Sequence, residues 1–132
     1  MPITFQPRLG TLLMCDFNTG FRPPEMVKVR PVVVVSRPHH SVAVVVPLSC
    51  TEPRPFEPCH HEMSLGSLPH SLQKKRCWAK CDMVTCVGFW RLDRVKDGKH
   101  PKTGKRIYVA PMVISADLAK IQQALRYVFQ LL

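Results

Sequence analysis

The chain has 132 residues, and its 19 lysines and arginines outnumber its nine acidic residues, which gives a formal net charge of +10. Such an excess in a small protein favours an anionic partner. Nucleic acid is the first candidate, and solubility or an acidic protein partner is the alternative. No stretch approaches the about eighteen consecutive apolar residues that a membrane helix requires, so we predict no membrane partner.

The length predicts one domain over residues 1–132. The first residues lack the basic region and long apolar segment of a secretory signal, which predicts a cytoplasmic protein. Disulfide frameworks belong to oxidising compartments, so we expect the six cysteines to be free. Several stand among apolar residues, which predicts that they are small core side chains.

The first half of the chain predicts three strands. The first is expected over residues 10–17, after which turn-forming residues begin a long loop over residues 18–29. Two valine-rich runs, residues 32–35 and 42–46, favour buried strands and pair most simply as an antiparallel hairpin. In a hairpin the start of one strand lies beside the end of the other. Arg30 and Ser49 are therefore predicted to be neighbours at one rim of a sheet.

The middle of the chain is polar and rich in turn-forming residues. Residues 50–75 are interpreted as a loop that contains one short strand near residues 60–65. Residues 77–87 are expected to form one strand, which continues over residues 89–95 after a bend at Gly88. Alternate side chains of a strand share a face. The shared face would carry Trp78, Lys80, Asp82 and Val84.

The last quarter predicts a basic turn over residues 96–106, a returning strand over residues 107–110 and one helix. Ser115 is the predicted N-cap, and Asp117 lies in the first turn, where an anion complements the helix dipole. Apolar residues at steps of three and four form one stripe that packs on the sheet. They are Leu118, Ile121, Leu125, Val128 and Leu132. The predicted fold is mainly β, a small, curved antiparallel barrel closed by a C-terminal helix.

Several segments occur in an order and spacing found in a known family. They are the strand that ends in Asp16, the loop from Glu25 to Arg30 with the valines that follow, and the strand that ends in Ser49. The strand after Cys77 and the final helix match less closely. Over nearly its full length the chain resembles the PemK/MazF family of endoribonuclease toxins from type II toxin-antitoxin systems.

The resemblance implies an SH3-like barrel, a homodimer, inhibition by a cognate antitoxin, and cleavage of single-stranded RNA with no metal or other cofactor. The family's arginine before proline falls on Arg30, its acidic loop residue on Glu25 and its hydroxyl residue on Ser49. Family members usually carry threonine at this last position. Serine keeps the hydroxyl but lacks the methyl group that fixes the rotamer, so we expect an effect on the efficiency of cleavage.

These residue types suit attack by the RNA 2′-hydroxyl, which needs proton removal, charge neutralisation at phosphorus and protonation of the leaving oxygen. Arg30 fits the second task, because its planar fork binds phosphate oxygens and stays charged. Ser49 would donate a hydrogen bond to a non-bridging oxygen, and Glu25 is the candidate base or orients Arg30. The alternatives are a solvent-facing rim arginine, a serine that satisfies a strand-end backbone group, and a solvated loop carboxylate.

Further charged residues are candidates for binding the RNA backbone. For the two lysine-rich clusters, the alternative is a solvated basic turn. For the acidic residue Asp82, the alternative is a structural hydrogen bond. The set comprises Lys28, Lys74, Lys75, Arg76, Lys80, Asp82, Lys99, Lys102, Lys105 and Arg106. Metal-ligand types also occur in Cys59, His60 and His61. The sequence lacks C-x-x-C and H-x-x-x-H spacings, so no metal site is predicted.

The resemblance, taken with these residues, implies the toxin component of a type II toxin-antitoxin system. Its activity would be metal-independent cleavage of single-stranded RNA, particularly mRNA, by 2′-hydroxyl attack that leaves a 2′,3′-cyclic phosphate. The alternative is a non-catalytic SH3-like module that binds nucleic acid or protein through a site degenerate at Ser49. A toxin with another target, such as a DNA-bound protein, is the third possibility.

Overall fold

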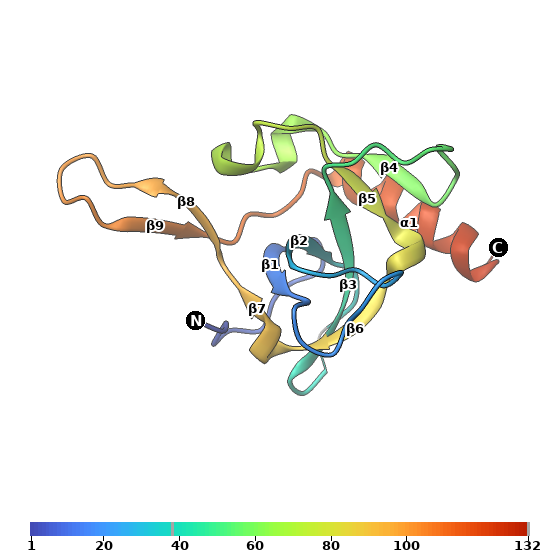
Figure 1. Cartoon of the computed structure of the whole chain (residues 1–132), viewed down its shortest axis with the longest axis horizontal. Helices are drawn as coiled ribbons and strands as arrows, with labels where there is room; N and C mark the ends of the chain where they lie inside the picture. Colours follow the sequence, from blue (N-terminus) through green and yellow to red (C-terminus); the bar gives the residue numbers. More distant parts are fainter. Residues whose placement is uncertain (38, 132) are drawn as a thin grey trace.

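The computed structural model describes residues 1–37 and 39–131, and its centre is a strongly bent antiparallel sheet (Figure 1). Within these residues the sheet has seven strands in the order β4-β5-β3-β2-β1-β7, and β6 also pairs with β3. The strands are β1 (Leu12–Asp16), β2 (Val29–Val34), β3 (Val42–Ser49), β4 (His60–Glu62), β5 (Trp78–Lys80), β6 (Thr85–Gly88) and β7 (Leu92–Asp93). A separate hairpin of β8 (Val95–Lys99) and β9 (Arg106–Val109) precedes the helix α1 (Ser115–Phe129).

The predicted valine hairpin is confirmed. β2 and β3 pair antiparallel, with Val33 opposite Val46 and Val34 opposite Val45, and β1 pairs with the other edge of β2. The β-branched side chains alternate between two apolar clusters, one on each face of the strands. Each fully buried valine contributes roughly 2 kcal/mol to folding through the removal of apolar surface from water.

The two clusters explain how the sheet and the helix hold together. On one face, Val33 and Leu48 pack with Ile121 and Ala124 of α1. On the other, Val32 and Val45 pack with Leu13, Cys15 and Phe17 inside the curved sheet. The prediction of cysteines in the core is confirmed for four of them. They are Cys15, Cys59, Cys77 and Cys81.

The prediction of one strand over residues 77–87 is wrong. β5 ends at Lys80, a 3-10 turn occupies Cys81–Met83, and β6 begins only at Thr85. β5 pairs with the end of β3, whereas β6 pairs with its beginning, and the two registers are offset. The chain must absorb extra residues between them, so it turns. As a result Asp82 and Val84 do not continue the face that Trp78 begins.

A second interruption follows at the predicted continuation over residues 89–95. A 3-10 turn occupies Phe89–Arg91, and β7 consists only of Leu92–Asp93. β7 pairs with Met14 and Cys15 of β1, which returns the chain to the first strand and curves the sheet towards closure. Short 3-10 turns of this kind are common connectors between elements.

The C-terminal helix is confirmed, although Ser115 is not its N-cap. The cap residue is Ile114, whose carbonyl accepts the amide of Leu118 at 3.1 Å and whose own amide donates to Ser67 Oγ at 3.0 Å. The predicted stripe packs on the sheet: Ile121 is buried, while Leu118, Leu125 and Val128 are partly buried against the same cluster. The predicted contribution of Leu132 lies outside the described residues. None of the helices in residues 1–37 and 39–131 combines the length and apolar character needed to span a bilayer.

Asp117 is the anchor of the helix, and its side chain is only 1% exposed. His61 Nε2 contacts its Oδ1 at 2.8 Å, the Ser64 hydroxyl donates to Oδ1 at 3.0 Å, and the Ser64 amide donates to Oδ2 at 3.0 Å. The Ser67 hydroxyl donates to Oδ2 as well. Burial acts to raise the pKa of Asp117, but these hydrogen bonds outweigh it and hold the pKa below its ordinary value. The sequence indicated the position of Asp117 in the first turn but none of these partners.

The β8–β9 hairpin projects from the body of the molecule (Figure 1). Its base is anchored where Val95, 2% exposed, pairs with Val109, and where Asp97 accepts the backbone amide of Ser71 at 2.9 Å. The side chains of residues 98–108 are exposed. The prediction of a basic turn over residues 96–106 is wrong for residues 96–99, which belong to β8, and residues 100–105 form the exposed tip of the hairpin.

Candidate active site

Arg30 lies in β2, directly opposite Cys15 of β1, on the face that Val32 and Val34 share. Its Nε atom is buried, and within the described part of the chain this atom finds no hydrogen-bond partner. A buried donor without an acceptor costs about 1–3 kcal/mol, and a charged donor costs more. An anion that reaches the guanidinium would recover that cost, so the position favours anion binding over a purely structural arginine.

Ser49 is the last residue of β3 and is 8% exposed. The backbone amide of Thr51 donates to its Oγ at 3.1 Å. This bond uses a lone pair of the oxygen and not the hydroxyl hydrogen. The hydrogen can therefore still be donated to an acceptor such as a phosphate oxygen.

The register of the hairpin relates the two residues. The pairing of β2 with β3 ends where Val32 lies opposite Pro47. Continued by two residues, the same register would set Arg30 opposite Ser49, which pairs with Trp78 of β5 on the other edge of β3. Residues opposite each other in an antiparallel pair share a face of the sheet. Arg30 and Ser49 therefore lie at the same end of the valine hairpin, and their action on one phosphate stays a prediction.

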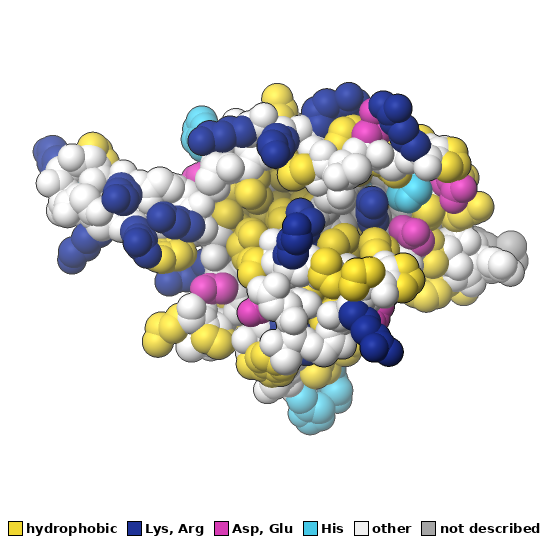
Figure 2. Space-filling model, viewed as in Figure 1, with side chains coloured by type: hydrophobic (Ala, Val, Ile, Leu, Met, Phe, Trp, Pro, Cys, Tyr) yellow, Lys and Arg dark blue, Asp and Glu magenta, His cyan; other side chains and the backbone are white. Residues whose placement is uncertain are grey.

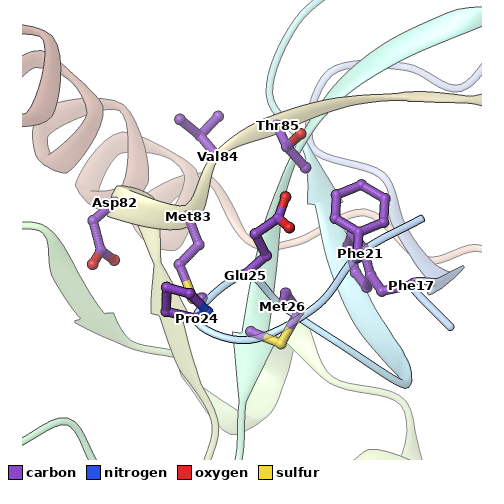
Figure 3. A pocket seen from close by; sticks show the side chains of 9 residues that line it. All are labelled: Phe17, Phe21, Pro24, Glu25, Met26, Asp82, Met83, Val84 and Thr85. Carbon is purple, nitrogen blue, oxygen red and sulfur yellow. The ribbon is translucent and has the colours of Figure 1, made fainter. Parts of the chain in front are cut away.

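Glu25 lines a cleft of about 300 Å³ between the loop after β1 and the segment from Asp82 to Thr85 (Figure 3). Its carboxylate extends into this cleft from the loop, and Asp82 lies at the far side. Glu25 Oε1 accepts the backbone amide of Arg22 at 3.3 Å. Among the residues that the structure describes, no hydrogen bond or ion pair joins Glu25 to Arg30, and its role as a base stays a prediction.

Beside Ser49 a row of side chains crosses three strands. Ser49 is opposite Trp78, and Trp78 is opposite Glu62. Arg76 covers the Trp78 ring at 4.8 Å and forms two hydrogen bonds of 2.8 Å to the Glu62 carboxylate. The hydrogen bonds from Arg76 hold the pKa of Glu62 below its ordinary value. Arg76 is thus already paired with a carboxylate, which reduces the net charge it offers to RNA.

The other predicted RNA-binding residues fall into two sets. The first borders the rim: Lys28 is exposed two residues before Arg30, Lys80 is half-buried in β5, and Lys74 and Lys75 are exposed just before that strand. The second set lies on the projecting hairpin and is exposed. It consists of Lys99, Lys102, Lys105 and Arg106. Figure 2 shows basic side chains over the hairpin and along the edge near β4 and β5.

One cluster could in principle hold a metal ion, since ligand atoms of Cys59, His60 and Asp82 lie within 4.8 Å of one another. His60 Nδ1, however, accepts the backbone amide of Glu57 at 3.1 Å. The neutral ring then carries its hydrogen on Nε2, which lies 3.8 Å from Asp82 Oδ1. A nitrogen in this state has no free lone pair for a metal, so the cluster as folded does not fit one.

Comparison with known proteins decides the family. A model described as the PemK-like, MazF-like toxin of type II toxin-antitoxin systems matches residues 8–129. The chain belongs to this family. The PemK/MazF-like toxin is also 32% identical to the putative uncharacterised protein YifN of Escherichia coli (strain K12). The match extends over 117 residues and covers 73% of this chain and 78% of YifN.

Solved structures show the same fold for this PemK/MazF-like toxin. One is an endoribonuclease in complex with its cognate antitoxin from mycobacterial species, with a TM-score of 0.63 and 21% identity, covering 96% of this chain and 97% of that one. Another is MazF from Deinococcus radiodurans, with a TM-score of 0.63 and 17% identity, covering 96% and 99%. The predicted fold class and family are confirmed.

Proposed function

We propose that this toxin is an endoribonuclease that cleaves single-stranded RNA, particularly mRNA, in the cytoplasm and without a metal ion. The supporting observation is the buried Nε of Arg30, which finds no hydrogen-bond partner within residues 1–37 and 39–131 and lies at the same end of the valine hairpin as Ser49. RNA brings its own nucleophile, so two groups that grip the phosphate supply much of what catalysis requires. Family membership and the net charge of +10 support an anionic substrate.

In the proposed reaction the RNA 2′-hydroxyl attacks the adjacent phosphorus and the 5′-oxygen leaves, which gives a 2′,3′-cyclic phosphate and a 5′-hydroxyl. The Arg30 guanidinium neutralises the charge that grows on the non-bridging oxygens. The Ser49 hydroxyl donates to one of these oxygens. Glu25, which lines the cleft between the loop after β1 and the segment from Asp82 to Thr85, accepts the 2′-hydroxyl proton or orients Arg30.

The partners follow from the same assignment. We propose that residues 1–132 act as one toxin domain, that two copies form a homodimer, and that a cognate antitoxin blocks the site. The fold similarity to an endoribonuclease found in complex with its antitoxin supports the last of these. An acidic antitoxin segment would complement the basic rim.

The direct test incubates the purified toxin with mixed RNA in excess EDTA and analyses the ends of the products. We expect cleavage to continue, with 2′,3′-cyclic phosphate at one new end and 5′-hydroxyl at the other. Salt-sensitive binding with no cut products at high protein concentration would instead indicate the non-catalytic module. Cleavage that stops in EDTA and returns with a divalent ion would contradict the metal-independent reaction.

Replacing Ser49 by alanine is expected to lower kcat by about 10- to 100-fold, because one donor to the phosphate is lost. Replacement by threonine keeps the hydroxyl and is expected to retain activity. Single-turnover cleavage of a defined RNA measures both, and thermal unfolding checks that the loss of the Thr51 contact has not unfolded the strand end. Equal activity of the alanine and threonine variants would remove Ser49 from the mechanism.

Neutralising the hairpin is expected to weaken RNA binding without changing kcat. Glutamines at four of its five lysine and arginine positions remove contacts to phosphates, so KM should rise about tenfold and the dependence of binding on salt should become less steep. The variant carries glutamine at Lys99, Lys102, Lys105 and Arg106. A matched control carries glutamine at four exposed positions elsewhere, Arg8, Arg37, Lys120 and Arg126. Equal salt dependence in the two variants would show that overall charge, and not the hairpin, holds the RNA.

A further inference from the structure

Two cysteines meet immediately beyond the candidate active site. Ser49 is opposite Trp78 in the pairing of β3 with β5, and the same register continued by one residue sets Cys50 opposite Cys77. Their Sγ atoms lie 3.8 Å apart. Antiparallel neighbours have Cα atoms about 4.5–5.5 Å apart, which lies within the range that a disulfide spans. Closing the bond requires the sulfurs to approach by about 1.8 Å, which a side-chain rotation can supply.

The two thiols differ in accessibility. Cys50 is exposed, whereas Cys77 is 1% exposed and contacts the Cys50 sulfur. Burial, together with the neighbouring Cys50, raises the pKa of Cys77 to about 12, which keeps that thiol protonated and unreactive towards solutes. Burial likewise raises the pKa of Cys15 and Cys81 to about 12. An oxidant in solution would therefore meet Cys50 first and find a second thiol already in place behind it.

We propose that Cys50 and Cys77 are a redox modification site, which peroxide converts into a reversible disulfide that restrains Ser49 and slows RNA cleavage. The first half stands on the contact between the two sulfurs. The second half rests on the proposed function of Ser49. Where disulfides occur in cytosolic proteins, they are usually transient and serve catalysis or redox sensing.

The chemistry balances with hydrogen peroxide as the oxidant. The Cys50 thiolate attacks one peroxide oxygen, so an S–O bond forms, the O–O bond breaks and the released hydroxide takes the thiol proton to become water. Cys77 sulfur then attacks Cys50 sulfur, the S–S bond forms, and the S–O bond breaks. The second hydroxide takes the Cys77 proton. Two thiols and one peroxide thus give one disulfide and two waters, and an external thiol reverses the reaction.

The bond would act on the site through the backbone. Residues 49–51 form a tight turn in which the Thr51 amide donates to Ser49 Oγ. A disulfide draws the Cβ atom of Cys50 towards that of Cys77. Because Ser49 directly precedes Cys50, the shift displaces Ser49 from its position at the end of β3. Small displacements of a positioned group cost up to about 100-fold in rate, so we expect oxidation to reduce kcat at least about tenfold.

The test treats the full-length toxin with stoichiometric hydrogen peroxide and maps its peptides by mass spectrometry before and after a reducing thiol. We expect the mass to fall by two hydrogen atoms, with residues 50 and 77 in one crosslinked peptide that dithiothreitol separates. Cys50→Ser and Cys77→Ala should each lose the crosslink. Cys86→Ser changes an exposed cysteine of β6 and should keep it. A Cys50 sulfinic acid, a crosslink between two copies, or a crosslink that survives in Cys50→Ser would overturn the pairing.

Cleavage of a defined RNA by the same samples tests the second half. We expect the oxidised wild type to be slower and to recover with dithiothreitol, and Cys50→Ser to be insensitive to peroxide. A crosslinked protein with unchanged kcat would overturn the regulatory effect while leaving the bond intact. If no sample cleaves RNA, the proposed function fails, but the mapped crosslink still decides the modification itself.

Discussion

Replacing Arg30 by alanine is expected to reduce kcat for RNA cleavage by about a thousandfold, the range seen when a charged group that stabilises a phosphoryl transition state is removed. The reason is specific to the position. Arg30 offers a buried donor that no described residue satisfies, and it lies at the same end of the β2–β3 hairpin as Ser49. Its loss therefore removes charge stabilisation and leaves the fold with one fewer buried unpaired donor. Single-turnover cleavage of a defined RNA gives the rate, and thermal unfolding of the same variant gives the stability.

Two controls separate the charge from its geometry. Arg30→Lys keeps a positive charge but loses the planar fork, and is expected to recover only part of the rate. Arg37→Ala removes an exposed arginine from the connection after β2 and is expected to leave cleavage unchanged. An Arg30→Ala protein that unfolds like the wild type and cleaves RNA within a few-fold of its rate would remove Arg30 from the mechanism.

Asp117→Ala is expected to lower the free energy of unfolding by about 3 kcal/mol. The substitution leaves the buried hydroxyl of Ser67 and two partly buried donors of Ser64 without their acceptor, and each lost buried partner costs about 1–3 kcal/mol. It also releases His61 of β4 from α1. Urea unfolding at neutral pH measures the change. The control Asp82→Ala alters an exposed carboxylate and is expected to stay within about 0.5 kcal/mol of the wild type.

Acidification is expected to reduce the contribution of Asp117 to the free energy of unfolding. The fold holds the pKa of Asp117 below its ordinary value, so its carboxylate stabilises the fold fully above the unfolded-state pKa, about 3.9, and less as pH falls through the folded-state pKa. The stability difference between wild type and Asp117→Asn is therefore expected to be largest near neutral pH and to shrink below about pH 4. A difference that grows on acidification would show that the carboxylate is not held in its ionised form.

The parts of the fold that could be predicted from sequence are those with a strong local period. Four consecutive valines and a second valine-rich run after a short loop favour a buried hairpin, and the hairpin sets Arg30 and Ser49 at the same end. The apolar stripe of α1 is equally local. Both predictions depended on residues close in sequence, where strand and helix periods determine which side chains share a face.

The rest depended on contacts between distant segments. The 3-10 turn at Cys81–Met83 arises because β5 and β6 pair with different ends of β3 in offset registers, which no local pattern indicates. The partners of Asp117 come from an aperiodic polar segment 50 to 56 residues earlier. Cys50 and Cys77 are 27 positions apart in the sequence and come into contact because β5 pairs with β3. Glu25 lies in a loop whose shape is not encoded by any period, and its role stays a prediction.

The most direct measurement is a crystal structure of the toxin with a short RNA that carries a 2′-O-methyl group at its mapped cleavage site. The methyl group blocks the nucleophile, so the uncut phosphate remains in place. We expect the guanidinium of Arg30 and the hydroxyl of Ser49 to lie within hydrogen-bond distance, about 3 Å, of non-bridging oxygens of that one phosphate. A blocked phosphate bound out of reach of either side chain would contradict the proposed site.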